Sequence, residues 1–121
     1  VERVVELICE MRMQKEVLIS SFNHDYLARV KELAAEIKTG VLVENADPNP
    51  LMLVSRLNAQ AYNPKFGCVT PEEIHRLREH GIDVFIYTVN DPREMKYLID
   101  AQASGIFTDF PQTLKDILSM K

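Results

Sequence analysis

The sequence predicts an α/β fold in which short strands and helices alternate and the strands form a parallel sheet. Apolar runs rich in Val and Ile alternate with segments whose apolar residues recur at helical spacing. The runs recur roughly every 22 residues, which is the length of one strand–helix unit with short loops. Consecutive units of this kind favour right-handed crossovers, which place neighbouring strands parallel.

Composition indicates a single globular domain and limits its partners. The 121 residues are 46% hydrophobic and 26% charged, so we expect one domain spanning 1–121 with its own core. The net charge of -4 disfavours a nucleic-acid partner, and no apolar run is long enough to cross a bilayer. Cys9 and Cys68 lack the spacing of metal ligands, so we expect free, buried thiols and a cytoplasmic location.

The chain opens with an amphipathic segment that has no helix start signal. Val1, Val4, Val5 and Ile8 fall on one face of this predicted helix. Because an uncapped start looks cut from something longer, we expect the chain to be a fragment, with a complete short protein as the alternative.

Five strand–helix units are predicted after this opening helix. Each strand is an apolar run, and most helices begin at a capping residue or a proline. The strongest helix start is Thr-Pro-Glu-Glu at 70–73, and Gly81 ends that helix. The predicted strands are 17–22, 39–44, 59–63, 82–89 and 105–108, and the helices that follow them are 25–37, 48–57, 71–80, 90–99 and 111–120.

Two architectures accommodate five parallel units: an open doubly wound sheet, or part of a TIM (β/α)₈ barrel. The open nucleotide-binding sheet requires a glycine-rich turn after its first strand. None of the five strand-to-helix turns in this sequence is glycine-rich, so we favour the barrel. A complete barrel takes about 250 residues, so this chain would supply about five of its strands.

In a barrel, the functional groups lie at the carboxyl ends of the strands. Glu44 ends an apolar strand and is the strongest ionisable candidate, although one carboxylate holds a divalent cation poorly. Phe22 and Tyr87 occupy strand ends too, where they could be core aromatics or a substrate wall. His24 has no nearby Cys or His partner, which makes a role as metal ligand or base the minority interpretation.

Strand alternation and helix capping give further expectations. If Tyr87 points into the barrel, Phe85 and Val89 share its side while Val84, Ile86 and Thr88 meet the helices. If Phe22 points inward, Leu18 and Ser20 do as well. Capping explains residues such as Asn23, Asn90, Asp25 and Asp91, which lie just before predicted helices.

Three segments in register with the strand–helix repeat resemble the C-terminal half of glycerophosphodiester phosphodiesterases. They are Ser-Ser-Phe-Asn at 20–23, Tyr-Thr-Val-Asn at 87–90 and Gly-Ile-Phe-Thr-Asp-Phe-Pro at 105–111, with an Asn-Pro turn at 63–64 between them. The resemblance extends from about Val4 onward. It departs from the family at Tyr87, where the family motif commonly has Trp.

The resemblance implies a barrel that hydrolyses glycerophosphodiesters, with a divalent cation such as calcium or magnesium, to glycerol 3-phosphate and an alcohol. The family's His-Arg-Gly, Glu-x-Asp, second catalytic His and Glu-x-Lys segments are expected in the part of a barrel that precedes Val1. We therefore predict no catalytic residue and no metal ligand in this chain. The resemblance assigns Phe22, Glu44, Asn63 and Tyr87 to the wall of the substrate pocket.

Two other hypotheses stay open from the sequence. The chain could be a stand-alone half-barrel without catalysis, which binds a partner or forms a homo-oligomer through its exposed sheet edges. It could also end a different barrel hydrolase. On the favoured hypothesis, residues 1–121 alone have negligible activity, because the reactive groups lie elsewhere in the barrel.

Overall fold

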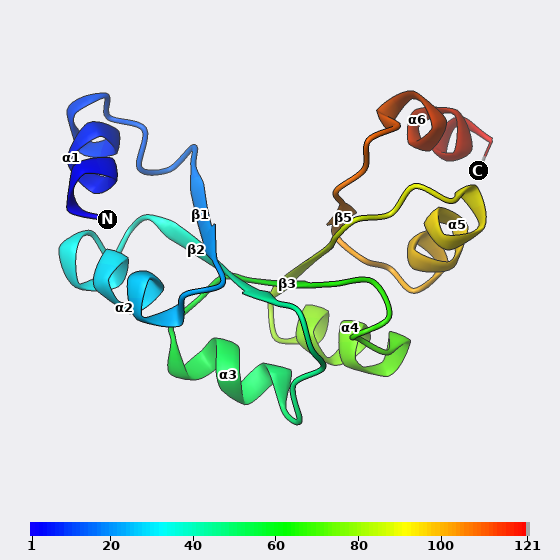
Figure 1. Ribbon diagram of the computed structural model, residues 1–121, viewed down its shortest axis with the longest axis horizontal. Helices are drawn as coiled ribbons and strands as arrows, with labels where there is room; N and C mark the ends of the chain where they lie inside the picture. The colour runs from blue at the N-terminus through cyan, green and yellow to red at the C-terminus, as the bar shows by residue number, and fades with distance from the viewer. Residues whose placement is uncertain (121) are drawn as a thin grey trace.

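The computed structural model describes residues 1–120, which form one five-stranded parallel sheet with helices on one side. The strands follow chain order, β1-β2-β3-β4-β5, and the sheet curves into an arc with the helices outside (Figure 1). The strands are β1 (Leu18–Ser21), β2 (Lys38–Val43), β3 (Ala61–Pro64), β4 (Asp83–Ile86) and β5 (Gly105–Ile106), and the helices are α1 (Glu2–Glu10), α2 (His24–Leu33), α3 (Pro50–Arg56), α4 (Pro71–Glu79), α5 (Pro92–Asp100) and α6 (Pro111–Ser119). The predicted alternation of strands and helices is confirmed.

Side-chain caps explain where four of the helices begin. The side chain of Asn23 accepts hydrogen bonds from the first turn of α2, and that of Asn49 does the same for α3. Thr70 and Glu73 form the predicted capping box of α4, and the Asp91 side chain caps α5. These caps fix the helix starts at the ends of the segments that follow the strands.

The core lies between the sheet and the helices on the convex side. Its larger part is formed by strand residues such as Val41, Tyr62 and Ile86, packed with Leu77 of α4 and Met95 of α5. Each fully buried aliphatic side chain of this kind contributes about 1.5–3 kcal/mol relative to an exposed one. A second cluster, formed by Val5, Val30, Ala34 and Ile37, joins α1 to α2.

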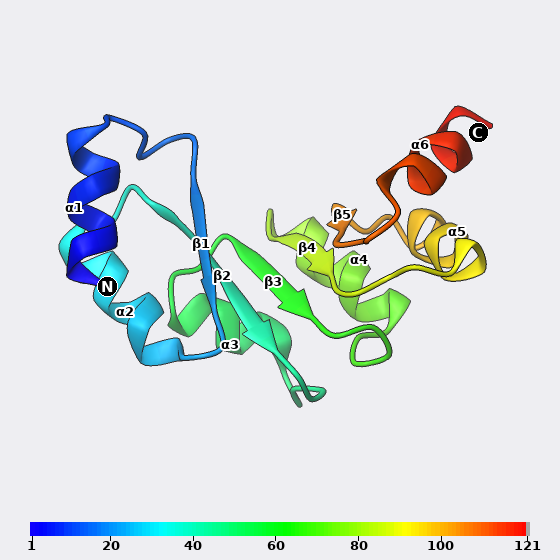
Figure 2. The same ribbon diagram turned by 45° about the horizontal axis from the view of Figure 1, so that its top comes forward.

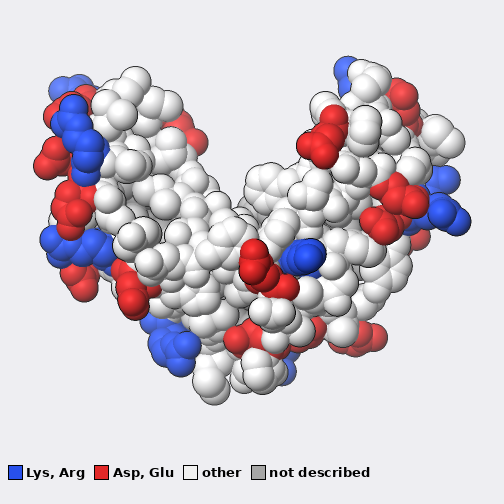
Figure 3. All heavy atoms as spheres, in the orientation of Figure 1, with Lys and Arg blue, Asp and Glu red and all other residues white. Residues whose placement is uncertain are grey.

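The concave side of the sheet carries the alternate side chains. Leu18 and Ser20 are exposed together with Phe22, whereas Ile19 packs on the core, so the predicted alternation in β1 is confirmed. Figure 3 shows that charged side chains gather over the outer helices and are sparse within the hollow of the arc. Figure 2 shows the strands side by side, from β1 in the N-terminal arm to β5 in the C-terminal arm.

Alternation in β4 holds only as far as the strand continues. Val84 and Ile86 are buried against the helices, as expected, and Tyr87 is not part of that core. The expectation for the next two residues is wrong: Val89 is fully buried in the helix-side core and Thr88 is exposed. The reason is that β4 ends at Ile86, so the two-residue alternation of a strand no longer applies beyond it.

Two other expectations need correction. Helix α2 ends at Leu33 instead of residue 37, because the backbone of Ala34 leaves the helical conformation at φ -156°. The Lys31 ammonium donates hydrogen bonds to the carbonyls of Ala35 and Ile37 in the segment that follows. The cysteines are not disulfide-bonded, but Cys9 and Cys68 are half-buried instead of fully buried. None of the helices in residues 1–120 is long and apolar enough to span a membrane.

Candidate functional site

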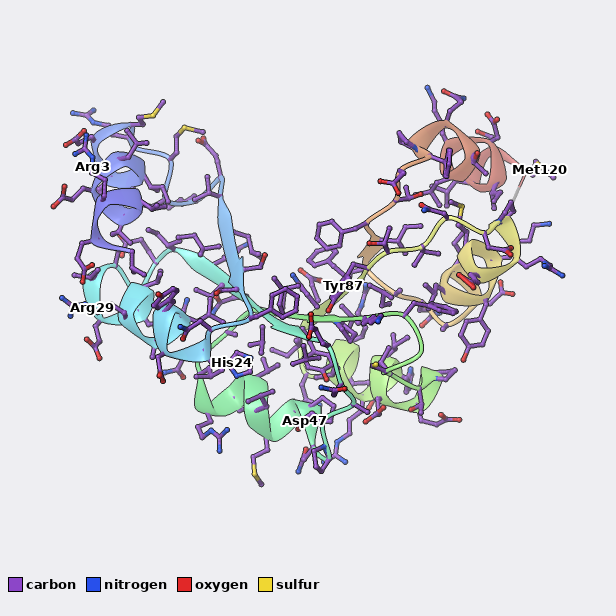
Figure 4. All side chains as sticks on the ribbon, in the orientation of Figure 1. Arg3, His24, Arg29, Asp47, Tyr87 and Met120 are labelled. Atoms are coloured by element: carbon purple, nitrogen blue, oxygen red, sulfur yellow. The ribbon has the colours of Figure 1, made fainter. Side chains whose placement is uncertain are left out.

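The carboxyl ends of β1, β2, β3 and β4 meet on the concave side near the middle of the arc. Figure 4 shows Tyr87 there, with His24 and Asp47 below it. The parallel register explains the meeting, since Val41 lies opposite both Ser21 and Tyr62, and Tyr62 lies opposite Val84. Residues that follow these four strands therefore face a common space, which we call the mouth of the arc.

Two aromatic rings from different strands pack against each other at the mouth. The ring centroids of Phe22 and Tyr87 are 6.0 Å apart and the rings meet edge to face at 84°. The Tyr87 hydroxyl donates a 2.7 Å hydrogen bond to the carbonyl of Val43 at the end of β2. Burial, and then the nearby charge of Glu44, raise the pKa of the Tyr87 hydroxyl, so it stays a protonated donor.

A hollow of about 360 Å³ opens beside the aromatic pair and contains the carboxylate predicted from sequence. Glu44 is exposed within it, and the Cys68 thiol donates to the Glu44 carbonyl at 3.4 Å. His24 also lines the hollow, but its Nε2 lies 3.2 Å from the Leu42 carbonyl, to which a protonated Nε2 donates. The lining residues are Phe22, His24, Leu42, Val43, Glu44, Asn45, Ala46 and Asp47.

The fourth predicted residue is near the mouth but closed off from it. Asn63 has no exposed surface, and neither atom of its side-chain amide has a hydrogen-bond partner among residues 1–120. It lies beside Gly40, where an added Cβ would come within 2.9 Å of the Asn63 Nδ2. The structure thus brings Phe22, Glu44 and Tyr87 together at one site, whereas Asn63 is buried beside Gly40 and does not line the hollow.

Sequence reasoning missed a polar network that links the ends of β4 and β5. The Asn90 Oδ1 accepts hydrogen bonds from the Thr108 hydroxyl at 3.1 Å and from the Asp109 backbone N–H at 3.0 Å. The Asn90 Nδ2 donates to the Asp109 carboxylate at 3.0 Å. The expectation that Asn90 caps a helix is therefore wrong, since Asp91 caps α5. The available signal was that polar residues follow two adjacent strands.

The described residues do not form a cation site on their own. No group of three or more His, Cys, Asp or Glu side chains within residues 1–120 is arranged to hold a metal ion. Two Glu-x-Lys tripeptides occur, at 36–38 and 94–96. The first lies at the amino end of β2 and the second within α5, so neither is at the carboxyl end of a strand.

A larger hollow lies elsewhere. It has a volume of about 470 Å³ and lies between the segment that joins β3 to α4, which contributes Phe66, and the helix α5, which contributes Tyr97 and Leu98. None of the four residues predicted for the substrate wall lines this hollow, so we place the candidate site at the smaller one, which Phe22 and Glu44 line.

Comparison with known proteins gives matches along almost the entire chain. The Glycerophosphoryl diester phosphodiesterase family pattern matches residues 1–113. The chain is 37% identical to the protein YqiK of Bacillus subtilis, over 97% of this chain and 49% of that protein. It is 32% identical to a glycerophosphodiester phosphodiesterase of Caldanaerobacter subterraneus, over 97% of this chain and 48% of that protein. The chain therefore spans about half the length of these relatives.

Solved structures match the fold over nearly all of the chain. A glycerophosphodiester phosphodiesterase from Parabacteroides distasonis matches with a TM-score of 0.88 at 23% identity, over 98% of this chain and 50% of that one. A phosphodiesterase from Oleispira antarctica, solved in complex with the product sn-glycerol-3-phosphate, matches with a TM-score of 0.86 at 21% identity, over 98% and 48% respectively. The arc of five strands thus has the fold of part of a barrel, as predicted.

Proposed function

Since this chain belongs to the Glycerophosphoryl diester phosphodiesterase family, we propose that it forms the C-terminal wall of an active site for glycerophosphodiester hydrolysis. The products of the complete barrel are glycerol 3-phosphate and an alcohol, and the barrel uses a divalent cation, calcium or magnesium. Residues 1–121 are one partial-barrel domain and are inactive alone. The coverage of about half of each relative supports this assignment.

The observation that carries the proposal is the pairing of aromatic rings with a carboxylate at the strand ends. The edge-to-face rings of Phe22 and Tyr87 give an apolar surface for the carbon atoms of a glycerol group. Glu44 beside them repels a phosphate anion and attracts hydroxyl donors or a cationic alcohol group. The wall therefore orients the uncharged and cationic parts of the substrate, with the phosphate directed away from Glu44.

The cation belongs to another part of the barrel. A divalent cation offsets the negative charge that develops on a phosphodiester during attack. The described residues contain no set of ligands for it, so we assign no step to a metal bound by this chain. The proton-transferring imidazoles are likewise expected outside this chain, because His24 is engaged with the Leu42 carbonyl.

Turnover of glycerophosphocholine tests the proposal. We expect negligible release of glycerol 3-phosphate by residues 1–121 with excess calcium, and release when the chain is refolded with the N-terminal half of the Caldanaerobacter relative.

In that complex, Phe22→Ala should raise KM roughly 3- to 10-fold, because an aromatic contact contributes about 0.5–1.5 kcal/mol beyond its area. The exposed Met52 on α3 provides a control, Met52→Ala, with KM unchanged. Turnover by the isolated chain after repurification, or a folded complex without turnover, would contradict the proposal.

A second candidate function is self-association. In the described sheet, β1 and β5 each have one neighbouring strand, so each leaves an edge that can pair. Apolar side chains are exposed at both arms, among them Val4 and Leu7 of α1 and Leu118 of α6. Light scattering at high concentration should then report a dimer or larger species, and Leu7→Glu should weaken it. A folded monomer throughout the concentration range would refute this candidate.

The remaining partner and location assignments are proposals of the same kind. The net charge of -4 supports a small-molecule ligand over nucleic acid. The absence of a disulfide between Cys9 and Cys68 is compatible with the cytoplasm, which keeps thiols reduced. Fractionation of cells that express the protein, with detection of the protein in each fraction, tests the location directly.

A further inference from the structure

A hollow of about 470 Å³ lies outside the proposed substrate wall, between α5 and the segment 65–70, and we call it the α5 hollow. The segment leaves β3 and turns back into α4 (Figure 1). Its volume falls within the roughly 300–1,000 Å³ that is typical of small-molecule sites. Space is open beside Gly67, where an added Cβ would meet no atom beyond its chain neighbours within 4 Å. Most of the lining side chains are apolar: Phe66, Val69, Pro71, Tyr97 and Leu98.

Two aromatic rings from different elements form a wall of the α5 hollow. The ring centroids of Phe66 and Tyr97 are 6.5 Å apart, and the rings meet edge to face at 80°. The Phe66 backbone N–H donates a 2.6 Å hydrogen bond to the carbonyl of Tyr87, just after β4, whereas Tyr97 is carried by α5. Because the fold holds both rings in place, an apolar ligand meets a surface that is already formed.

The α5 hollow is built from neighbouring strand–helix units in the middle of the fold. The next helices on either side are also present, since α3 contacts α4 and α6 contacts α5. Strands that complete a barrel would join at the free edges of β1 and β5, not at the segment between β3 and α4. The hollow is therefore available to a ligand and is not the seat of a missing strand.

Charged groups of opposite sign lie at the rim of the α5 hollow. Arg93 and Glu94 both line it, and an Asp91 oxygen lies 3.4 Å from an Arg93 nitrogen. A bound ion of either sign would be attracted by one of these charges and repelled by another, and solvent screens the Arg93 side chain, which is 92% exposed. A hydroxyl group instead donates to the Glu94 carboxylate and accepts from the Arg93 guanidinium. The Thr70 hydroxyl, which also lines the hollow, is already engaged in the capping box of α4.

We propose that the α5 hollow binds the apolar body of an uncharged alcohol, with the alcohol hydroxyl between Arg93 and Glu94. This site is separate from the proposed substrate wall, because no residue of that wall lines it. The hydrogen bond from Phe66 to Tyr87 makes it a neighbour of the mouth. The identification of the ligand with the alcohol that leaves a glycerophosphodiester rests on the proposed function.

Backbone amide NMR of the intact chain tests the proposal with three probes of similar shape: phenethyl alcohol, phenylacetate and phenethylammonium. The Gly67 amide reports the α5 hollow, and the amide of Leu7, whose apolar side chain is exposed on α1, reports unspecific contact. Phenethyl alcohol should shift the Gly67 signal in a saturable way and leave the Leu7 signal unchanged. Each of the two ions should need a concentration about threefold higher, or more, for a half-maximal shift.

Exposed tyrosines on two helices give a matched pair of variants. Tyr97→Ala removes one ring of the wall and should raise the half-maximal concentration of phenethyl alcohol about fivefold. Tyr26→Ala on α2 should leave that concentration unchanged. Tyr97 is 48% exposed and Tyr26 is 53% exposed, so both variants should keep the circular dichroism spectrum of the unaltered chain.

Variants at the rim test the charge argument. Glu94→Gln should lower the half-maximal concentration of phenylacetate about twofold, because the variant removes a charge that repels this anion. Arg93→Gln should do the same for phenethylammonium, and it keeps the backbone N–H that donates to the Asp91 cap. Opposite or absent changes would overturn the assignment of the hydroxyl to this rim.

The contrary results separate this proposal from the proposed function. An unshifted Gly67, equal shifts of Gly67 and Leu7, or equal effects of the two tyrosine variants would overturn the site. Equal or tighter binding of either ion would overturn the assignment to an uncharged alcohol. A Gly67 shift that follows protein concentration without any probe would assign the hollow to a second copy of the chain and overturn the proposal. A complete barrel that binds phenethyl alcohol at Gly67 but releases no glycerol 3-phosphate would contradict the proposed function and support the α5 hollow.

Discussion

Replacing Gly40 with alanine should destabilise the sheet where β2 passes closest to the Asn63 side chain. The added Cβ would lie 2.9 Å from the Asn63 Nδ2, 3.1 Å from the Leu18 Cδ2 and 3.3 Å from the Asn63 Oδ1. Asn63 is fully buried and cannot swing into solvent, so either its side chain leaves a favoured rotamer or β2 moves. Overpacking of this kind costs about 1–3 kcal/mol.

Part of that cost is recovered in the unfolded chain. Alanine restricts the unfolded backbone more than glycine does, which stabilises a compatible site by about 0.4–1 kcal/mol. The net change is therefore a loss of about 0–2.6 kcal/mol in the free energy of unfolding, with a central value of about 1.3 kcal/mol. For a domain of this size each kcal/mol shifts the melting temperature by roughly 3–5 °C, so the melting temperature should fall measurably.

Urea unfolding followed by circular dichroism measures the change. Ser20 is the register partner of Gly40 on β1 and is exposed, so Ser20→Ala serves as the matched control and should change stability little. The double variant Gly40→Ala/Asn63→Ala shortens the side chain that the new Cβ would meet, so it should recover part of the stability lost in Gly40→Ala. A double-mutant cycle quantifies this coupling. If Gly40→Ala were as stable as the unaltered chain, the close approach of β2 and Asn63 would be refuted.

Two further predictions concern the helix caps that follow the strands. Thr70→Ala removes the hydroxyl that accepts the hydrogen bond of the Glu73 backbone N–H, and it should cost about 1 kcal/mol in thermal unfolding. The exposed Ser55→Ala should not have this cost, and equal effects would contradict the capping role. Hydrogen bonds from the Arg93 backbone, and then from the Arg93 side chain, lower the pKa of the Asp91 carboxyl in the folded chain. The stability that the ionised carboxyl contributes is therefore present above its pKa in the unfolded chain and is lost as the pH falls through its pKa in the folded chain. When the pH is lowered from 7 into the acid range, the melting temperature of the unaltered chain should therefore fall more than that of Asp91→Asn. Parallel curves of melting temperature against pH would refute this.

Local patterns predicted the elements well because caps and apolar periodicity are short-range signals. The capping box at Thr70 and the strand around Val84 and Ile86 needed only neighbouring residues to be identified. The position of Asn90 could not be predicted, because its partners Thr108 and Asp109 lie one strand–helix unit away and depend on how β4 and β5 pair.

The site shows the same division between local and distant causes. Placement of Phe22, Glu44 and Tyr87 at strand ends followed from the barrel hypothesis, and the structure places them at a common mouth. Burial of Asn63 was not foreseeable, since it depends on Gly40 one strand away and on side chains above it. The turn of Val89 into the core also required knowing where β4 stops.

The division of the core into two clusters has a consequence for how the molecule opens. Val5 of α1 packs with Val30 and Ile37 apart from the larger cluster, and Ile19 packs against both. Because α1 joins the fold through this smaller cluster, α1 can detach while the β3–α4–β4 region stays folded. Amide protons of α1 should then exchange with deuterium well before those of β3, and mild proteolysis should cut first around residues 11–16.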